Sequence, residues 1–143
     1  MGPDVHFKLT YRWAVEEGFG HEEAERVAAA DVGYDELYPA RRSLANITRH
    51  FAPWAWLWSR HYFRRSIRLD DLVLLGWALH CAQDAVAHGT LGEKHLLLRA
   101  RLGRDPDSWT GAPSGVRRRV EAVSRERLAA YRGMVERNVR PRR

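Results

Sequence analysis

The stretch LGWALHCAQDAVAHGTLGEKH, residues 75–95, is the centre around which the rest of the chain is organised. Within it, His80, Asp84 and His88 recur at intervals of four among apolar and small residues. Residues i, i+4 and i+8 lie in one row along an α-helix, so this spacing predicts three polar side chains on one helix face. A buried carboxylate needs a partner, which is either a hydrogen-bonded histidine or a bound cation. Both interpretations fit these three residues.

Composition limits the fold class. The 143 residues are rich in helix formers and show no strand-length alternation of Val and Ile. This length suffices for one domain with a buried core. The single cysteine, Cys81, excludes a disulfide framework and is expected to be a small buried residue. We therefore predict an all-α, single-domain helical bundle over residues 1–138, followed by a basic tail at residues 139–143.

The charge balance and the hydropathy pattern limit the partners. Basic residues outnumber acidic ones by 24 to 18, for a formal net charge of +6, which favours anionic partners. The longest apolar run, residues 72–79, is far too short to cross a bilayer, so no stable membrane insertion is predicted. Residues 1–10 carry no apolar leader segment, which predicts a cytoplasmic protein, or a secreted one if a leader was removed.

Periodic apolar positions, capping residues and glycines predict helices at residues 5–17, 21–33, 71–88, 93–102 and 116–138. Residues 41–50 fit either a short helix or an irregular connection. In the second helix, the run Ala28–Ala30 predicts a close approach to a neighbouring helix, and Asp31 follows this tight face. A carboxylate at such a position needs a partner.

An aromatic-rich segment, HFAPWAWLWSRHYF at residues 50–63, follows the connection. Its aromatic side chains fit core packing, or a surface that faces substrate or lipid. Arg64, Arg65 and Arg68 come next and predict a solvated helix face.

Side chains that can bind metal recur in five segments. These candidate ligands are His6, Asp31, His50, His80, Asp84, His88 and His95. Imidazoles and carboxylates without thiolates are a donor set that catalytic zinc sites often use. The sequence therefore predicts a metal site between the helices.

Four local motifs resemble those of the zinc-dependent phospholipase C and fungal single-strand nuclease superfamily. They are HFKLTYRWA beginning at His6, AAADVGYDELYP with Asp31, RHFAP with His50, and LGWALHCAQDAVAH with His80, Asp84 and His88. Their order and gaps agree with the family over residues 5–95, about two thirds of the chain. The resemblance implies that the protein binds zinc, as one or two divalent ions, and hydrolyses a phosphodiester in a phospholipid or a nucleic acid.

The resemblance also implies a role for each candidate. Asp31, His50, His80 and Asp84 would form one metal position, and His6 with the terminal amine would share Asp84 with a second. Asp84 would thus be the central catalytic residue, and His88 with His95 would contribute to a third position. In the family, the metals bind the phosphate and activate the attacking water.

Three departures from the family pattern bear on these roles. Only three residues separate Asp84 from His88, where the family has five. Arg99 stands where the family has a carboxylate ligand, so the third position lacks a ligand unless Glu93 supplies it. Val32 replaces the aromatic residue that helps the bacterial phospholipases to hold choline.

Two other functions fit the sequence. One is a helical domain that binds metal without turnover. The other is an Arg-rich helical domain that binds nucleic acid or an acidic membrane through its C-terminal helix, where Glu121 and Glu126 could instead pair with the arginines.

Overall fold

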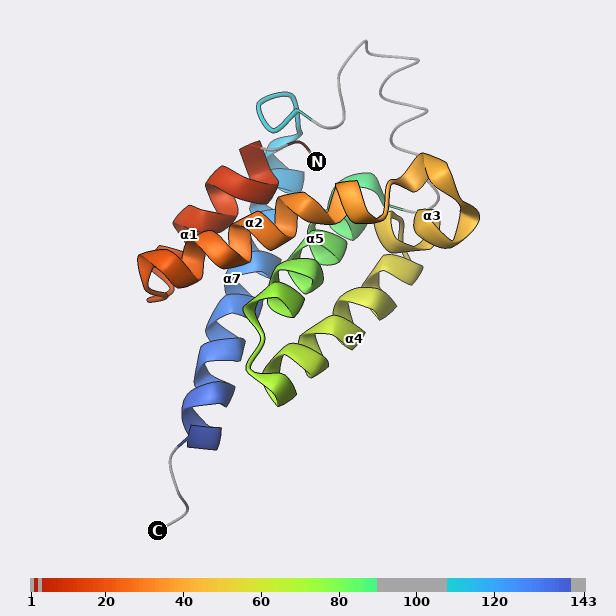
Figure 1. The fold of residues 1–143 in the computed structure, drawn as a ribbon. Coiled ribbons are helices and arrows are strands. Elements are labelled where there is room, and N and C mark those ends of the chain that lie inside the picture. The colour runs from red at the N-terminus through yellow and green to blue at the C-terminus, as the bar shows by residue number, and fades with distance from the viewer. Residues whose placement is uncertain (1, 3, 90–107, 140–143) are drawn as a thin grey trace.

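The structure, a computed structural model, describes residues 2, 4–89 and 108–139 (Figure 1). These residues form helices and no β-strand, which confirms the predicted all-α bundle. In order, the elements are a π-helical segment η1 (Asp4–Leu9), α1 (Thr10–Glu16), α2 (His21–Leu37), a 3₁₀ turn η2 (Ala40–Arg42), α3 (Leu44–His50), α4 (Trp54–Leu69), α5 (Leu72–His88) and α7 (Ser114–Val139). None of the helices in this described part combines the length and the apolar character that a membrane-spanning segment needs.

Helix α5 lies at the centre of the bundle, between α4 on one side and α2 on the other (Figure 1). Its bounds agree with the helix predicted at residues 71–88. Asp71 caps its start, because its carboxylate accepts hydrogen bonds from the backbone N–H groups of Val73 and Leu74 at 2.8 and 3.2 Å. Gly89 ends it with a φ of 65°, a conformation that favours glycine. The row of His80, Asp84 and His88 therefore lies on a helix whose two ends are both defined by local interactions.

Helices α2 and α5 touch at Gly76. A Cβ atom at this position would lie 2.5 Å from the carbonyl oxygen of Val27 and 2.7 Å from the Cβ of Ala30. Only glycine allows the two backbones to come this close. The alanine-rich segment of α2 thus makes the predicted close approach, and it brings Asp31 next to α5.

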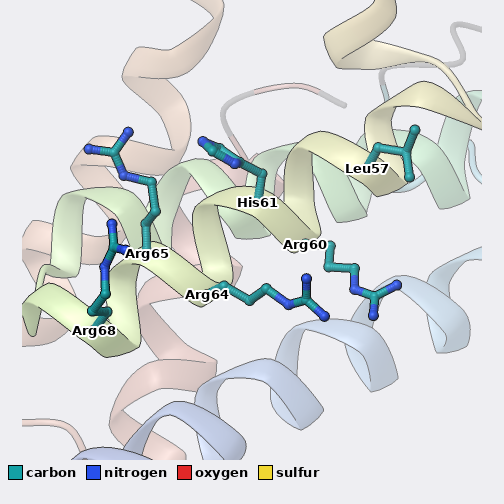
Figure 2. A pocket seen from close by; sticks show the side chains of 6 residues that line it. All are labelled: Leu57, Arg60, His61, Arg64, Arg65 and Arg68. Carbon is teal, nitrogen blue, oxygen red and sulfur yellow. The ribbon is translucent and has the colours of Figure 1, made fainter.

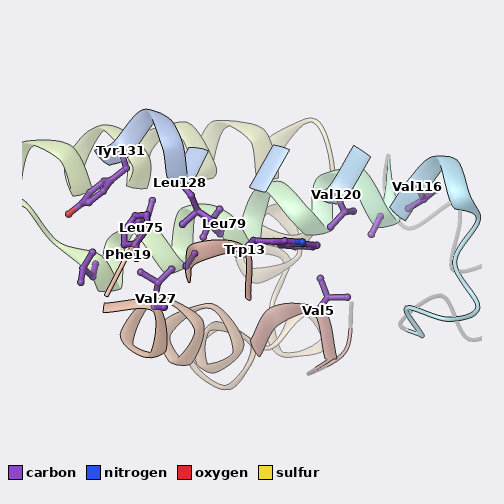
Figure 3. Close-up of a cluster of buried hydrophobic side chains, with 14 of the residues drawn as sticks. Val5, Trp13, Phe19, Val27, Leu75, Leu79, Val116, Val120, Leu128 and Tyr131 are labelled. Carbon is purple, nitrogen blue, oxygen red and sulfur yellow. The ribbon is translucent and has the colours of Figure 1, made fainter. Parts of the chain in front are cut away.

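Two clusters of buried apolar side chains lie on the two sides of α5. Figure 3 shows the larger, where side chains of α1, α2, α5 and α7 meet around Trp13, Leu79 and Leu128. The smaller lies between α2, α4 and α5 and includes Tyr34 and Tyr62. Tyr34 of the smaller cluster also packs against the candidate ligand His80, with 4.8 Å between the ring centroids.

Some boundaries and environments differ from those predicted from the sequence. The first helix is divided between η1 and α1, and α2 continues to Leu37 instead of ending near Gly33. Residues 93–102, predicted as a helix, lie outside the described residues, as does the tail after Val139. The aromatic segment serves in part as core, since Tyr62 is buried, whereas Trp54 is 51% exposed.

Candidate metal centre

Six of the seven candidate ligands lie together inside the bundle. They come from η1 (His6), α2 (Asp31), α3 (His50) and α5 (His80, Asp84, His88), and all six are buried. His95 and the terminal amine lie outside the described residues, so their predicted roles stay predictions. Histidines and aspartates from four separate segments thus meet in one place, and a group of this kind could hold a metal ion.

Four ligand atoms of this cluster lie close together, all within 4.8 Å of one another. His50 Nδ1 lies 2.8 Å from Asp84 Oδ2, and His80 Nε2 lies 3.2 Å from the same oxygen. The two imidazole nitrogens are 3.3 Å apart. The fourth atom, Asp35 Oδ1, is 3.6 Å from His50 Nδ1 and 3.4 Å from His80 Nε2. Zinc holds four tetrahedral ligands at about 2.0–2.1 Å, which places those ligands about 3.3–3.4 Å from one another. These five distances lie around that value, as the ligands of a four-coordinate zinc site would.

The second nitrogen of each of these imidazoles faces a backbone carbonyl. His80 Nδ1 is 2.9 Å from the carbonyl oxygen of Asp31, and His50 Nε2 is 2.7 Å from that of Tyr38. When Nδ1 of His80 and Nε2 of His50 donate to these carbonyls, the lone pairs of the other two nitrogens point to Asp84. Metal-binding histidines in proteins are oriented by this type of hydrogen bond.

Asp35 occupies the place that the resemblance gives to Asp31. Asp31 is one helical turn earlier on α2, where its Oδ2 accepts a hydrogen bond from the hydroxyl of Thr10 at 2.8 Å. Its Oδ1 lies 2.9 Å from His6 Nδ1 and 3.4 Å from His80 Nδ1, so these three residues form a second, adjoining group. Asp35 was missed from the sequence, although its i+4 spacing from Asp31 places both carboxylates in one row of α2.

Asp84 uses its two oxygens in different directions. Oδ2 belongs to the group with His50 and His80, whereas Oδ1 lies 3.4 Å from His6 Nε2 and 3.2 Å from His88 Nε2. These two distances are again close to the ligand spacing around zinc. The arrangement is the one expected of a carboxylate that can bridge two metal positions.

A buried polar network fixes the orientation of His6. Gln83 accepts a hydrogen bond from His6 Nδ1–H at 2.8 Å, and its amide group donates to the hydroxyls of Thr10 and Ser124. Ser124 donates in turn to the carbonyl of Val120, so its hydroxyl is available to accept from Gln83. This chain of donors places the proton of His6 on Nδ1 and leaves Nε2 with a free lone pair. Gln83 and Thr10 were not singled out from the sequence, and the signal for Gln83 was a polar residue inside an apolar run.

The charges of the cluster stabilise one another. Burial opposes a charged His80, but the Asp84 carboxylate and hydrogen bonds to Asp31, Asp35 and Asp84 raise the pKa of His80 well above its usual value. Burial also opposes a charged Asp84, but the nearby His88 and His80 and a hydrogen bond from His50 hold the pKa of Asp84 well below its usual value. Protonated His80 thus carries a positive charge at the place where a metal ion would bind, and the ion would have to displace this proton.

Cys81 follows His80 on α5 and belongs to the buried cluster with Tyr34 and Tyr62. Burial raises the pKa of its thiol to about 11, so the side chain is a neutral thiol at physiological pH. A neutral buried thiol agrees with the prediction of a small buried residue. The candidate metal-ligand atoms of the cluster are therefore nitrogens and oxygens.

No protein-family model, no curated protein and no solved structure matches this chain.

Proposed function

We propose that this chain is a zinc-binding helical protein that hydrolyses a phosphodiester. The observation that carries the proposal is the close grouping of four ligand atoms, Asp35 Oδ1, His50 Nδ1, His80 Nε2 and Asp84 Oδ2, at distances near those between the ligands of zinc. The orientation of both histidines by backbone carbonyls supports it, and so does a donor set of imidazoles and carboxylates.

One buried atom without a hydrogen bond also fits a cation in this place. His6 Nε2 has no hydrogen-bond partner among the described residues and lies 3.4 Å from Asp84 Oδ1. Nearly all buried polar atoms in proteins are hydrogen-bonded, and an exception calls for an explanation such as an ion. A divalent ion held together with Asp84 Oδ1 would satisfy this atom.

Asp35 supports a catalytic role because it opens the cluster to solvent. Its side chain is 51% exposed, whereas those of His50, His80 and Asp84 are at most 4% exposed. A bound zinc ion would supply a Lewis acid that lowers the pKa of a water molecule and neutralises the charge of a phosphate. His50, His80 and Asp84 would hold the site together, and a phosphate ester, from a phospholipid or a nucleic acid, would approach past Asp35.

The same geometry favours a second candidate, a metal centre that stabilises the fold without turnover. Structural zinc sites have four protein ligands, whereas catalytic sites keep one position open. With Asp35 bound, the first position is closed.

The third candidate, polyanion binding by α7, has less support. Arg125 forms ion pairs with Glu16, Glu17 and Glu121, so its charge is balanced within the protein. Arg127 packs over the ring of Phe63, with 5.3 Å between the guanidinium carbon and the ring centroid. Arg125 and Arg127 of the C-terminal helix are therefore engaged in internal contacts.

The test of catalysis compares the rates at which the parent and two variants hydrolyse a chromogenic phosphodiester in the presence of zinc. Asp84→Asn removes a charged donor shared by both positions, so we expect turnover to fall to the background rate while the helical content stays the same. Glu22→Gln, an exposed change of the same type on α2, should leave the rate unchanged. Zinc binding without any turnover would favour the structural role, and an Asp84→Asn protein as active as the parent would contradict the site.

A further inference from the structure

Helix α4 carries a row of arginines that have no acidic partner among the described residues. Arg60, Arg64, Arg65 and Arg68, here called the α4 basic stripe, are all exposed. The helix contains no acidic residue, and within the described part of the chain none of the four side chains forms an ion pair or a hydrogen bond. Like charges three or four residues apart on a helix repel one another, so the stripe has a cost in stability that no described acidic side chain offsets.

Several arginines elsewhere in the described structure do have acidic partners. Arg12 and Arg132 each pair with a glutamate four residues later, and Arg125 pairs with three glutamates. The stripe instead gathers four exposed arginines on one helix without a described acidic partner, which gives α4 a local positive potential. An anionic partner is the simplest way to neutralise it.

The stripe has the geometry of a surface that binds several phosphates. Arg60, Arg64 and Arg68 follow one another at four-residue spacing, about 6 Å apart along the helix axis. With Leu57 and His61, the four arginines line one shallow hollow. Figure 2 shows Arg60 and Arg64 projecting toward one edge of α4, and His61 and Arg65 toward the other. The helix therefore presents a broad band of cationic groups.

Large apolar side chains lie at the other end of the same exposed face. Leu57 is 57% exposed and Trp54 is 51% exposed, and both precede the stripe along α4. At 100° per residue, residues 54, 57, 61, 65 and 68 stay within one exposed arc of the helix. Tryptophan favours the boundary between water and lipid, and leucine favours the acyl region below it.

We propose that the outer face of α4 docks on a lipid bilayer that contains anionic phospholipids. The α4 basic stripe would contact the headgroup phosphates, while Trp54 and Leu57 would enter the boundary between headgroups and acyl chains. A nucleic acid would also bind the arginines, but it gives no role to the exposed Leu57. This inference concerns peripheral binding and does not rest on the metal centre.

Vesicle flotation of the full-length chain tests the inference. We expect the protein to bind vesicles of phosphatidylcholine with phosphatidylglycerol, but not vesicles of phosphatidylcholine alone. Each basic side chain near an anionic surface strengthens binding to it. Arg64→Gln/Arg68→Gln removes two such side chains, so we expect it to weaken binding roughly thirtyfold. Leu57→Gln, which keeps the charge, should also weaken binding, because it removes an apolar group from the contact.

The matched control is Arg26→Gln/Arg118→Gln, which removes the same charge from exposed positions on α2 and α7. This variant should bind anionic vesicles nearly as well as the parent, and circular dichroism should show equal helicity for all variants. An equal loss in the control would overturn the inference, since net charge alone would then explain binding. So would equal binding to neutral vesicles. Tighter binding to an oligonucleotide than to vesicles, lost in Arg64→Gln/Arg68→Gln but kept in Leu57→Gln, would identify a nucleic-acid surface instead.

Discussion

Asp84 lies against four of the candidate ligands, all of them histidines. One of its oxygens faces His50 and His80, and the other faces His6 and His88. The i+4 spacing in the sequence correctly placed His80, Asp84 and His88 on one face of a helix, because helical geometry is local. Which histidines each of the two oxygens faces depends on side-chain rotamers and on three other segments. The spacing of residues along one helix does not determine these.

Asp35 provides a test of the site at a single residue. Asp35→Asn keeps the size of the side chain but weakens the fourth donor, so we expect it to lower zinc affinity by more than about tenfold, the smallest loss typical for an outer-shell partner. Calorimetric titration with zinc measures the change. Glu36→Gln, the exposed neighbour on α2, is the control and should bind zinc like the parent. An Asp35→Asn protein with parental affinity would mean that Asp35 is not a ligand.

The choice between Asp31 and Asp35 marks the limit of what the sequence can predict. Both lie in the motif AAADVGYDELYP, one helical turn apart, and both face α5. The structure separates them because Thr10 and His6, far away in sequence, hold the Asp31 carboxylate. A motif of one segment contains no information about such a partner.

At the scale of elements, the contact between α2 and α5 positions the cluster. Gly76→Ala would add a Cβ that lies 2.5 Å from the carbonyl oxygen of Val27 and 2.9 Å from the backbone nitrogen of Asp31. These are backbone atoms, so the helices must separate, and overpacking of this kind costs roughly 1–3 kcal/mol. We expect a corresponding loss in the free energy of unfolding, measured with urea, together with weaker zinc binding because α2 carries Asp35.

Gly33 provides the matched control on α2. A Cβ at this position meets nothing within 4 Å, so Gly33→Ala should raise helix stability by about 0.5–1 kcal/mol. Parental stability and zinc affinity in Gly76→Ala would show that the two helices do not need their close contact.

Local signals explain which elements the sequence predicted well. The bounds of α5 follow from the cap Asp71 and the terminal Gly89, and both operate within a few residues. The predicted end of the second helix, at residue 33, is too early, since α2 ends at Leu37. In the structure this helix continues for one more turn, which buries Tyr34 against α4 and α5 and carries Asp35 to the cluster.

At the scale of the whole molecule, the candidate ligands tie together four segments that are otherwise joined by short connections. Metal binding would therefore contribute to the free energy of folding. Removal of zinc with a chelator should lower the melting temperature, and His80→Ala should abolish this response. His61→Ala, which changes an exposed histidine on α4, should keep it.

The fall in melting temperature on removal of zinc should depend on pH, because zinc and a proton compete for His80. The pKa of His80 is raised well above the usual histidine value of about 6.5, so its protonated form stabilises the chelator-treated protein fully below pH 6.5. That contribution is lost as the pH rises through the raised pKa, whereas zinc requires the neutral imidazole. The difference in melting temperature between zinc-loaded and chelator-treated protein should widen from pH 6 to pH 8. A constant difference would contradict the competition.

The central claim, that the buried cluster of histidines and aspartates binds zinc, is tested most directly by native mass spectrometry. The protein is purified without chelator and exchanged into a volatile buffer with added zinc, and its intact mass is measured. We predict one or two zinc ions per chain in the parent, and fewer in Asp84→Asn. A parent protein that carries no zinc, or an Asp84→Asn protein that carries as much as the parent, would contradict the claim.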